Sequence, residues 1–164
     1  LNLVNARGLL SREPVANPNF RLVAEAAGYK LYENISVLPR FFFVGRIEFA
    51  RDLAEAARLL HRPDFQPADT AIVEAPSEPF GELSPEPSTN IEVIDYAPSR
   101  LILETHTAAP SFLVVTDAWY PGWEATIDGQ PARLYITDVA FRGLRVPAGD
   151  HRIEMRFVPR ILFW

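Results

Sequence analysis

The segment SFLVVTDAWYPGWEATIDGQ, residues 111–130, decides the fold class. It holds two β-prone runs, 111–117 and 123–128, and Pro121-Gly122 marks a turn between them. The Asp128-Gly129 pair that follows is the strongest hairpin signal in the chain, because both residue types accept the positive φ of a tight two-residue turn. The segment therefore predicts short antiparallel strands joined by turns.

Runs of the same kind continue on both sides of this segment. In 151–157, Ile153, Met155 and Phe157 alternate with charged residues, as expected for a strand with one buried face. Seven such runs separated by turn residues predict an antiparallel β-sandwich. The predicted strands are 90–96, 100–107, 111–117, 123–128, 132–137, 141–146 and 151–157.

The first half of the chain combines runs typical of β-strands with one stretch that has helical spacing. Two short runs around Ala27-Gly28 predict a hairpin, and the aromatic run 40–49 predicts a strand that is buried on both faces. Apolar residues at helical spacing in 51–61 predict a helix, which Pro63 ends. The run 70–74 predicts another strand. A strand, a helix and a strand at this spacing form a βαβ-like unit, whose two strands run parallel.

The domain organisation follows from a change of composition at 76–89. This segment carries four Pro, three Glu and no Lys or Arg, so it predicts a linker; an acidic docking segment is the alternative interpretation. The fold class is therefore mainly β, a C-terminal antiparallel β-sandwich preceded by a small α+β subdomain. The predicted parts are 1–75 as the subdomain, 76–89 as the linker, 90–160 as the sandwich and 161–164 as the start of a truncated apolar segment.

Composition excludes several classes of function. The chain has 164 residues, 48% of them hydrophobic, a formal net charge of -5 and no Cys, so it offers no disulfide framework and no thiol nucleophile. Basic residues are not interleaved with aromatic ones, so we expect no nucleic-acid partner. The only Met is Met155, which suggests a piece of a longer protein. The apolar end at 161–164 is interpreted either as the start of a membrane span or as a last strand.

Catalytic and metal-binding motifs find little support. The chain lacks G-x-S-x-G, G-x-G-x-x-G and phosphate-loop patterns, so we expect neither a catalytic residue nor a cofactor. His61, His106 and His151 are far apart in sequence, which is typical of surface or capping residues and not of a metal site. A glycosidase needs two carboxylates that flank a bond, and four acidic residues are near one another in sequence, namely Asp117, Glu124, Asp128 and Asp138.

The most unusual local feature is Asp117-Ala118-Trp119-Tyr120-Pro121-Gly122-Trp123. Tryptophan and tyrosine have flat apolar faces and a polar edge, which suit stacking on sugar rings, and a Pro-Gly turn would hold them on a loop. The competing interpretation is that the tryptophans close the open end of the sandwich. The candidate glycan-binding residues are Asp117, Trp119, Tyr120 and Trp123.

Two longer motifs carry a family resemblance. The runs DAWYPGWEATIDGQPARL and AFRGLRVPAGDHRIEMRFVPR resemble the C-terminal extracytoplasmic region of the YfhO-like bacterial membrane proteins. The front half is similar too, with Tyr32-Glu33-Asn34, Leu38-Pro39-Arg40 and the run FQPADTA at 65–71 in the same order. The resemblance covers nearly the whole chain.

The resemblance implies a multispanning membrane protein with a glycosyltransferase-like architecture. The chain would be its noncatalytic extracytoplasmic domain at the cell membrane, which binds a cell-envelope glycan or a partner, or acts as a scaffold, and whose partner is the remainder of the same protein. No catalytic residue carries over, because the membrane segments of that family are absent from this sequence. A purely structural domain that orients the membrane helices is the alternative, followed by a freestanding carbohydrate-active hydrolase.

Overall fold

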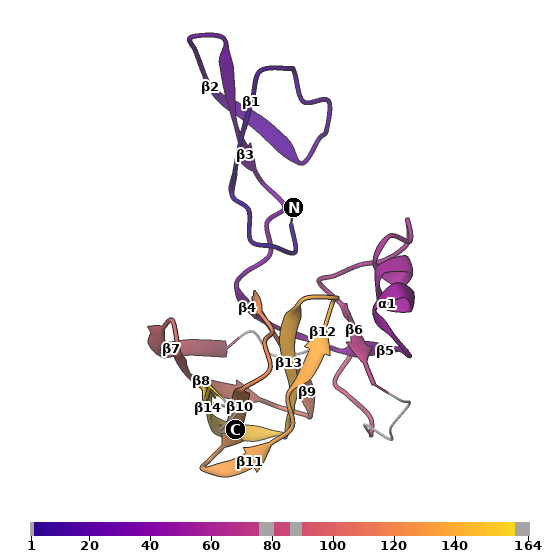
Figure 1. The fold of residues 1–164 in the computed structure, drawn as a ribbon, viewed down its shortest axis with the longest axis vertical. Coiled ribbons are helices and arrows are strands. Elements are labelled where there is room, and N and C mark those ends of the chain that lie inside the picture. The colour runs from indigo at the N-terminus through magenta and orange to yellow at the C-terminus, as the bar shows by residue number, and fades with distance from the viewer. Residues whose placement is uncertain (1, 76–80, 86–89, 160–164) are drawn as a thin grey trace, which may run out of the picture. The chain divides into compact units, whose positions relative to one another are not determined.

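The computed structural model describes residues 2–75, 81–85 and 90–159. The chain divides after Arg40 into two compact units, Leu1–Arg40 and Phe41–Trp164. Both are built from β-strands, and α1 (Leu53–Leu60) is the one α-helix in the described part (Figure 1). The mainly β fold class is therefore confirmed. In the same described part, no helix is both long and apolar enough to cross a membrane.

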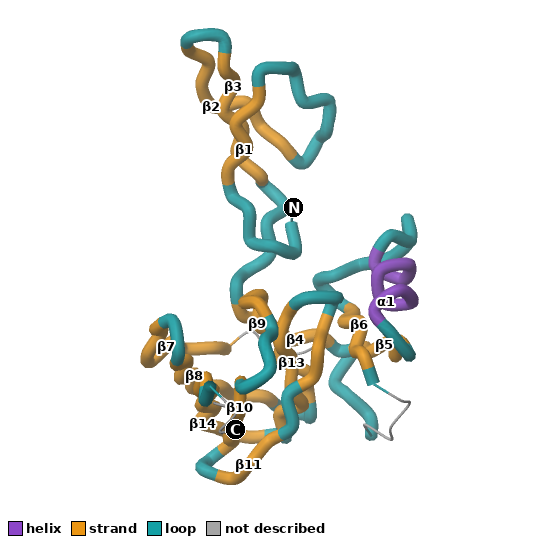
Figure 2. The backbone as a smooth tube through the Cα atoms, in the orientation of Figure 1, coloured by secondary structure: helices purple, strands orange, loops and turns teal. Residues whose placement is uncertain are grey.

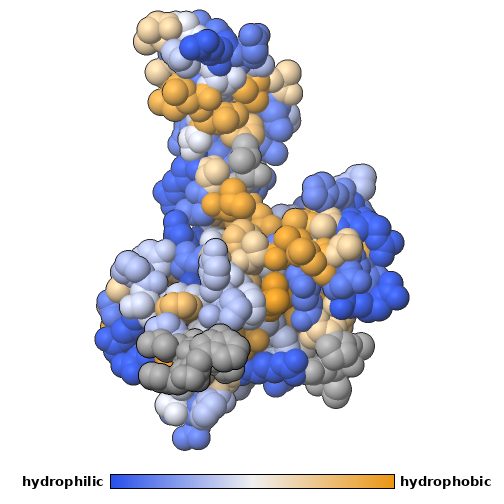
Figure 3. Space-filling view, in the orientation of Figure 1, coloured by the Kyte–Doolittle hydropathy of each residue, from blue (hydrophilic) through white to orange (hydrophobic). Residues whose placement is uncertain are grey.

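The first unit is a three-stranded antiparallel sheet of β1 (Gly8–Ser11), β2 (Phe20–Ala26) and β3 (Tyr29–Asn34), in the order β1-β3-β2. The predicted hairpin is confirmed, and its turn places Ala27 and Gly28 at φ 51° and 76°. The strand β1 was not predicted. Apolar side chains remain on the surface of this unit (Figure 3), among them Leu10 and Leu31, which lie opposite each other on β1 and β3.

The second unit is a sandwich of two sheets (Figure 2). A five-stranded sheet has the order β11-β10-β14-β8-β7, and a six-stranded sheet has the order β4-β9-β13-β12-β6-β5. The strands are β4 (Phe41–Val44), β5 (Arg46–Ala50), β6 (Thr70–Glu74), β7 (Asn90–Ala97), β8 (Arg100–Thr107), β9 (Ser111–Ala118), β10 (Trp123–Ile127), β11 (Gln130–Ala132), β12 (Tyr135–Thr137), β13 (Phe141–Val146) and β14 (Gly149–Phe157).

The main core lies between the two sheets. Alternate residues of β8, β9, β13 and β14 point inward and pack with one residue each from β4 and β10 into one buried cluster. Its members are Phe43, Leu101, Leu103, Leu113, Val115, Ala125, Leu144, Val146, Ile153 and Met155. Because Ile153 and Met155 belong to it, the inward face predicted for 151–157 is confirmed at these two positions; Phe157 is exposed.

The βαβ unit is confirmed. Strands β5 and β6 are parallel, and α1 connects them and packs over Ala50 and Ile72 (Figure 1). The side chain of Asp52 caps the helix by accepting a hydrogen bond from the Glu55 backbone N–H at 2.8 Å. At the other end, the His61 ring nitrogen Nδ1 lies 2.7 Å from the Ala57 carbonyl, so this histidine is a capping residue.

Two predicted strands are divided in the structure. The run 40–49 forms β4 and β5 on either side of Gly45, where a Cβ atom would collide with the backbone of Ser84. The run 132–137 also separates, because β11 pairs with β10 in one sheet whereas β12 pairs with β13 in the other. A segment that passes from one sheet to the other keeps inward-facing apolar residues in both sheets, so its sequence reads as one continuous strand.

The predicted domain boundary at residue 75 differs from the observed one. Strands β4, β5 and β6 are hydrogen-bonded into the same sheet as β9, β12 and β13, so 41–75 belongs to the sandwich and the separate unit ends at Arg40. Of the predicted linker, 76–80 and 86–89 lie outside the described residues; 81–85 contains neither helix nor strand, and the Ser84 backbone N–H donates to the Pro110 carbonyl at 2.7 Å. The predicted apolar segment 161–164 also lies outside the described residues.

Gly143 allows the close approach of β13 to its neighbours. A Cβ atom there would lie 2.6 Å from Phe112 Cζ, inside the van der Waals contact distance. We expect Gly143→Ala to lower the free energy of unfolding by about 1–3 kcal/mol, because the buried Phe112 ring has no room to move. Urea denaturation measures this. Gly8→Ala is the matched control, since the nearest atom to its new Cβ lies 4.0 Å away; equal losses in both variants would contradict the packing argument.

Candidate functional site

The loop between β9 and β10 is held in place by backbone hydrogen bonds. The Trp119 N–H donates to the Ala140 carbonyl at 2.8 Å, and the Val158 N–H donates to the Gly122 carbonyl at 2.7 Å. Gly122 has φ 110°, and a Cβ atom there would lie 2.7 Å from the Val158 carbonyl oxygen. The Pro-Gly turn therefore places the aromatic residues of the loop at a defined position beside β13 and the end of β14.

A cavity of about 400 Å³ lies between this loop and the β7–β8 turn. We call it the aromatic cavity. Three of the four predicted glycan-binding residues, Asp117, Tyr120 and Trp123, line it, whereas Trp119 is half-buried and is not among its lining residues. The remaining lining residues are Tyr96, Ala97, Pro98, Leu101, Ala118 and Arg142.

A buried arginine forms the floor of the aromatic cavity. Arg142 Nη2 lies 3.0 Å from Asp117 Oδ2, and the guanidinium carbon lies 3.8 Å from the centre of the Trp123 ring. Burial lowers the pKa of Arg142, while the Asp117 carboxylate raises it. Burial is the larger effect, so the pKa of Arg142 is lowered overall; the ion pair and the aromatic ring offset part of the cost of burying this cation.

Tyr96 completes the polar network. Its hydroxyl donates to Asp117 Oδ1 at 3.0 Å, so the two carboxylate oxygens accept from different partners. The Tyr96 ring packs edge-on against Phe41 at a centroid distance of 5.7 Å. Tyr96 is half exposed at the cavity, and Tyr120 is the most exposed aromatic residue there, with 64% of its surface accessible.

Trp123 has a packing role in this arrangement. The Arg142 guanidinium lies over its ring, the Phe157 ring lies at 5.6 Å, and Trp123 packs against the main core. The exposed aromatic faces of the cavity therefore belong to Tyr96 and Tyr120, and Trp123 forms an inner wall.

The prediction from sequence did not include Tyr96 and Arg142. Arg142 interrupts the apolar residues of β13, but Arg145 does so as well, and only Arg142 is buried. The pairing of β9 with β13 shifts register between Phe141 and Arg142, and this bulge accompanies the contact of Arg142 with Asp117. A local sequence pattern carries no signal for such a contact.

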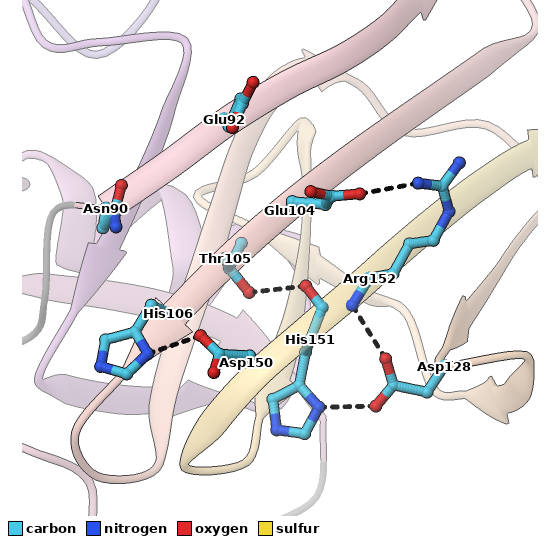
Figure 4. A pocket seen from close by; sticks show the side chains of 9 residues that line it. All are labelled: Asn90, Glu92, Glu104, Thr105, His106, Asp128, Asp150, His151 and Arg152. Carbon is cyan, nitrogen blue, oxygen red and sulfur yellow. Dashed lines mark hydrogen bonds and ion pairs between the residues drawn. The ribbon is translucent and has the colours of Figure 1, made fainter.

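A second, polar cavity of about 490 Å³ lies against the five-stranded sheet (Figure 4). Two histidine–aspartate pairs line it: His106 Nδ1 lies 2.6 Å from Asp150, and His151 Nδ1 lies 2.7 Å from Asp128. The hydrogen bond with Asp128 raises the pKa of His151. Within 2–75, 81–85 and 90–159, no three His, Cys, Asp or Glu residues are grouped so that they could hold a metal ion.

The four carboxylates considered for a glycosidase pair have different surroundings. Asp117 pairs with Arg142, Asp128 bonds His151 and the Arg152 backbone N–H, and Glu124 is exposed on β10. Asp138 is buried directly after β12, where its Oδ1 accepts from the Ile72 backbone N–H at 2.8 Å. Asp117, Asp128 and Asp138 thus each take part in a contact within the fold, whereas Glu124 is exposed.

Comparisons of the chain with protein-family models, with curated proteins and with solved structures found no match.

Proposed function

We propose that the second unit is a noncatalytic glycan-binding module that uses the aromatic cavity. The observation that carries the proposal is the exposed Tyr120 ring beside a cavity whose size lies in the range of small-ligand sites and whose floor is polar. A tyrosine face packs against the apolar C–H face of a sugar ring, and a carboxylate accepts hydrogen bonds from sugar hydroxyls.

The resemblance of the motifs around this cavity to YfhO-like proteins supports a wider proposal. The chain would belong to the extracytoplasmic side of a multispanning, glycosyltransferase-like protein of the cell membrane, and its glycan would be one of the cell envelope. The module would present that glycan to the remainder of the protein, and the transfer chemistry would take place outside this chain.

A purely structural domain that orients membrane helices is the second candidate. The contacts of Trp123 with Arg142 and Phe157 favour it, because they use the most prominent aromatic residue of the loop for packing. The two candidates differ in one respect: only the first requires the exposed ring of Tyr120.

A binding measurement separates the two candidates. We expect the chain to bind envelope-type oligosaccharides on a glycan array, and Tyr120→Ala to weaken that binding about tenfold or more by titration calorimetry, as truncation of a central aromatic contact does. Tyr29→Ala, which removes a partly exposed tyrosine of the first unit, is the control and should leave the affinity unchanged. A wild-type chain that binds no glycan would refute the module and leave the structural candidate.

A further inference from the structure

His151 lines the polar cavity and has a hydrogen-bond acceptor at each of its two ring nitrogens. Nδ1 lies 2.7 Å from Asp128 Oδ2 (Figure 4), and Nε2 lies 3.1 Å from the Ala148 carbonyl oxygen. An ionised carboxylate and a backbone carbonyl only accept hydrogen bonds, so both nitrogens must carry a hydrogen for both contacts to form. The observed contacts therefore belong to the positively charged form of the histidine.

The surroundings of the ring favour this charged form. The Asp128 carboxylate stays ionised, because hydrogen bonds with His151 and with the Arg152 backbone N–H lower its pKa. The hydrogen bond with Asp128 in turn outweighs the effect of burial and raises the pKa of His151 above the ordinary value of 6.5.

Other charged or titratable groups beside the ring come from three strands and form pairs of their own. They are Glu92 from β7, Glu104 and His106 from β8, and Asp150 and Arg152 from β14. Arg152 pairs with Glu104 at 2.9 Å, and His106 lies 2.6 Å from Asp150. Asp128 is therefore the carboxylate that acts on His151 through direct contact, and the other groups act from farther away.

The ring joins two turns of the sandwich. Asp128 begins the β10–β11 turn, where its backbone N–H donates to the Arg152 carbonyl and its Oδ1 accepts from the Arg152 N–H, both at 2.8 Å. These bonds hold this turn to β14 whatever the charge of the histidine. Ala148 belongs to the β13–β14 turn, where the Thr107 hydroxyl donates to the Pro147 carbonyl at 2.7 Å. A change at Ala148 is therefore local to that residue and its neighbours.

Loss of the ring proton breaks one of the two contacts, because a neutral imidazole keeps only one hydrogen. The charged Asp128 carboxylate is a stronger acceptor than the Ala148 carbonyl, so the hydrogen stays on Nδ1. The lone pair on Nε2 then faces the lone pairs of the carbonyl oxygen, and the contact with Ala148 opens. The wall of the polar cavity also becomes more negative, since the charge of Asp128 is no longer balanced.

We propose that His151 is a proton-operated clasp between the β10–β11 and β13–β14 turns. The charged ring closes the clasp by bonding both Asp128 and Ala148, and the neutral ring opens it at Ala148. The clasp is closed at low pH and opens as the pH rises, so the charge and the rim of the polar cavity depend on pH. This device is independent of the glycan binding proposed for the aromatic cavity.

NMR of the imidazole ring tests the clasp in the wild-type chain. We expect the ring nitrogen shifts to show hydrogens on both nitrogens of His151 below about pH 6, and a titration midpoint above 6.5. As the pH rises, Nε2 should lose its hydrogen while Nδ1 keeps it. A midpoint at or below 6.5, or loss of the hydrogen from Nδ1 in place of Nε2, would overturn the clasp.

A pair of variants tests whether Asp128 is the partner that sets the charge. Asp128→Asn removes the negative charge, keeps an oxygen for the Arg152 N–H and accepts the φ of 51° at this position. The His151 midpoint should fall in this variant, and clearly less in the matched control Asp150→Asn, because Asp150 bonds His106. Equal falls would show a general effect of negative charge and contradict the clasp. If Asp128→Asn is unfolded by circular dichroism, the ring nitrogen shifts of the wild type decide.

The amide of Gly149 reports on the opening itself, because it directly follows the Ala148 carbonyl. In the wild type its shift should change with the midpoint of His151. That change should disappear in His151→Gln and persist in His106→Gln, which removes the other histidine of the polar cavity. A Gly149 shift that titrates in the same way in His151→Gln would show that the β13–β14 turn does not respond to His151.

Discussion

Arg142→Met is expected to lower the free energy of unfolding by about 3–5 kcal/mol, the range observed when one partner of a buried ion pair is removed. Methionine fills a similar volume, but it removes the guanidinium that pairs with the mostly buried Asp117 carboxylate. The Trp123 ring also loses the guanidinium that lies 3.8 Å above it. Urea denaturation monitored by tryptophan fluorescence measures the loss.

Arg145→Met is the matched control for this variant. Arg145 lies on the same strand, β13, but is exposed, so its replacement should change stability by no more than about 0.5 kcal/mol. The double variant Arg142→Met/Asp117→Asn should lose less than the sum of the two single variants, because the uncompensated charge is then gone. Additive losses would show that the ion pair does not couple the two residues.

Asp138→Asn is expected to make the protein more stable than wild type above about pH 8, and to remove a large part of the pH dependence of stability. Burial raises the pKa of Asp138 to about 7, against an ordinary value of 3.8. The folded state therefore keeps a proton that the unfolded state releases. Stability from this group is fully present below about pH 4 and is lost as the pH rises towards 7, by about 4 kcal/mol in total.

Asparagine suits this position because it is neutral at every pH and accepts the left-handed backbone of Asp138, at φ 49°. Its carbonyl oxygen can take the place of Asp138 Oδ1 as the acceptor for the Ile72 N–H. Urea denaturation of wild type and variant at pH 4 to 9 gives the difference in stability at each pH. Using this difference cancels the contributions of Glu74 and His151, whose pKa values are also raised.

Asp64→Asn is the matched control, because it makes the same chemical change on a side chain that is 80% exposed. It should leave the pH dependence of the free energy of unfolding as it is in wild type. A stability difference between wild type and Asp138→Asn that stays constant from pH 4 to 9 would contradict a protonated Asp138 in the folded state.

Much of the strand pattern could be read from the residues themselves. Turn residues such as Asp128-Gly129 act locally, since their φ values of 51° and 79° suit only a few residue types, and the predicted hairpin is present. The helix after β5 was predictable for the same reason, because its cap, its apolar face and its stop at Pro63 all lie within a dozen residues. The strand β1 was not predicted because it is four residues long and none of its residues is buried.

The candidate site was only half predictable. Asp117, Tyr120 and Trp123 stood out because they lie together in one short segment. Tyr96 precedes that segment by about twenty residues and Arg142 follows it by about the same distance, and only the pairing of the sheets brings their side chains to Asp117. The sequence also could not tell which aromatic residue is exposed and which is packed. Tyr120 and Trp123 are only three residues apart, yet Tyr120 is exposed whereas Trp123 packs against the main core.

By itself, the sequence determined the mainly β class, the turns and the parallel βαβ unit, because these depend on backbone preferences and on apolar periodicity within short windows. Tertiary structure alone decided that 41–75 joins the sandwich, that the run 132–137 divides between two sheets, and that Arg142 is buried against Asp117 and Trp123. The physical reason is the same in each case. Strand partners and buried charge pairs are chosen by packing between residues distant in sequence, and such packing leaves no periodic trace in the chain.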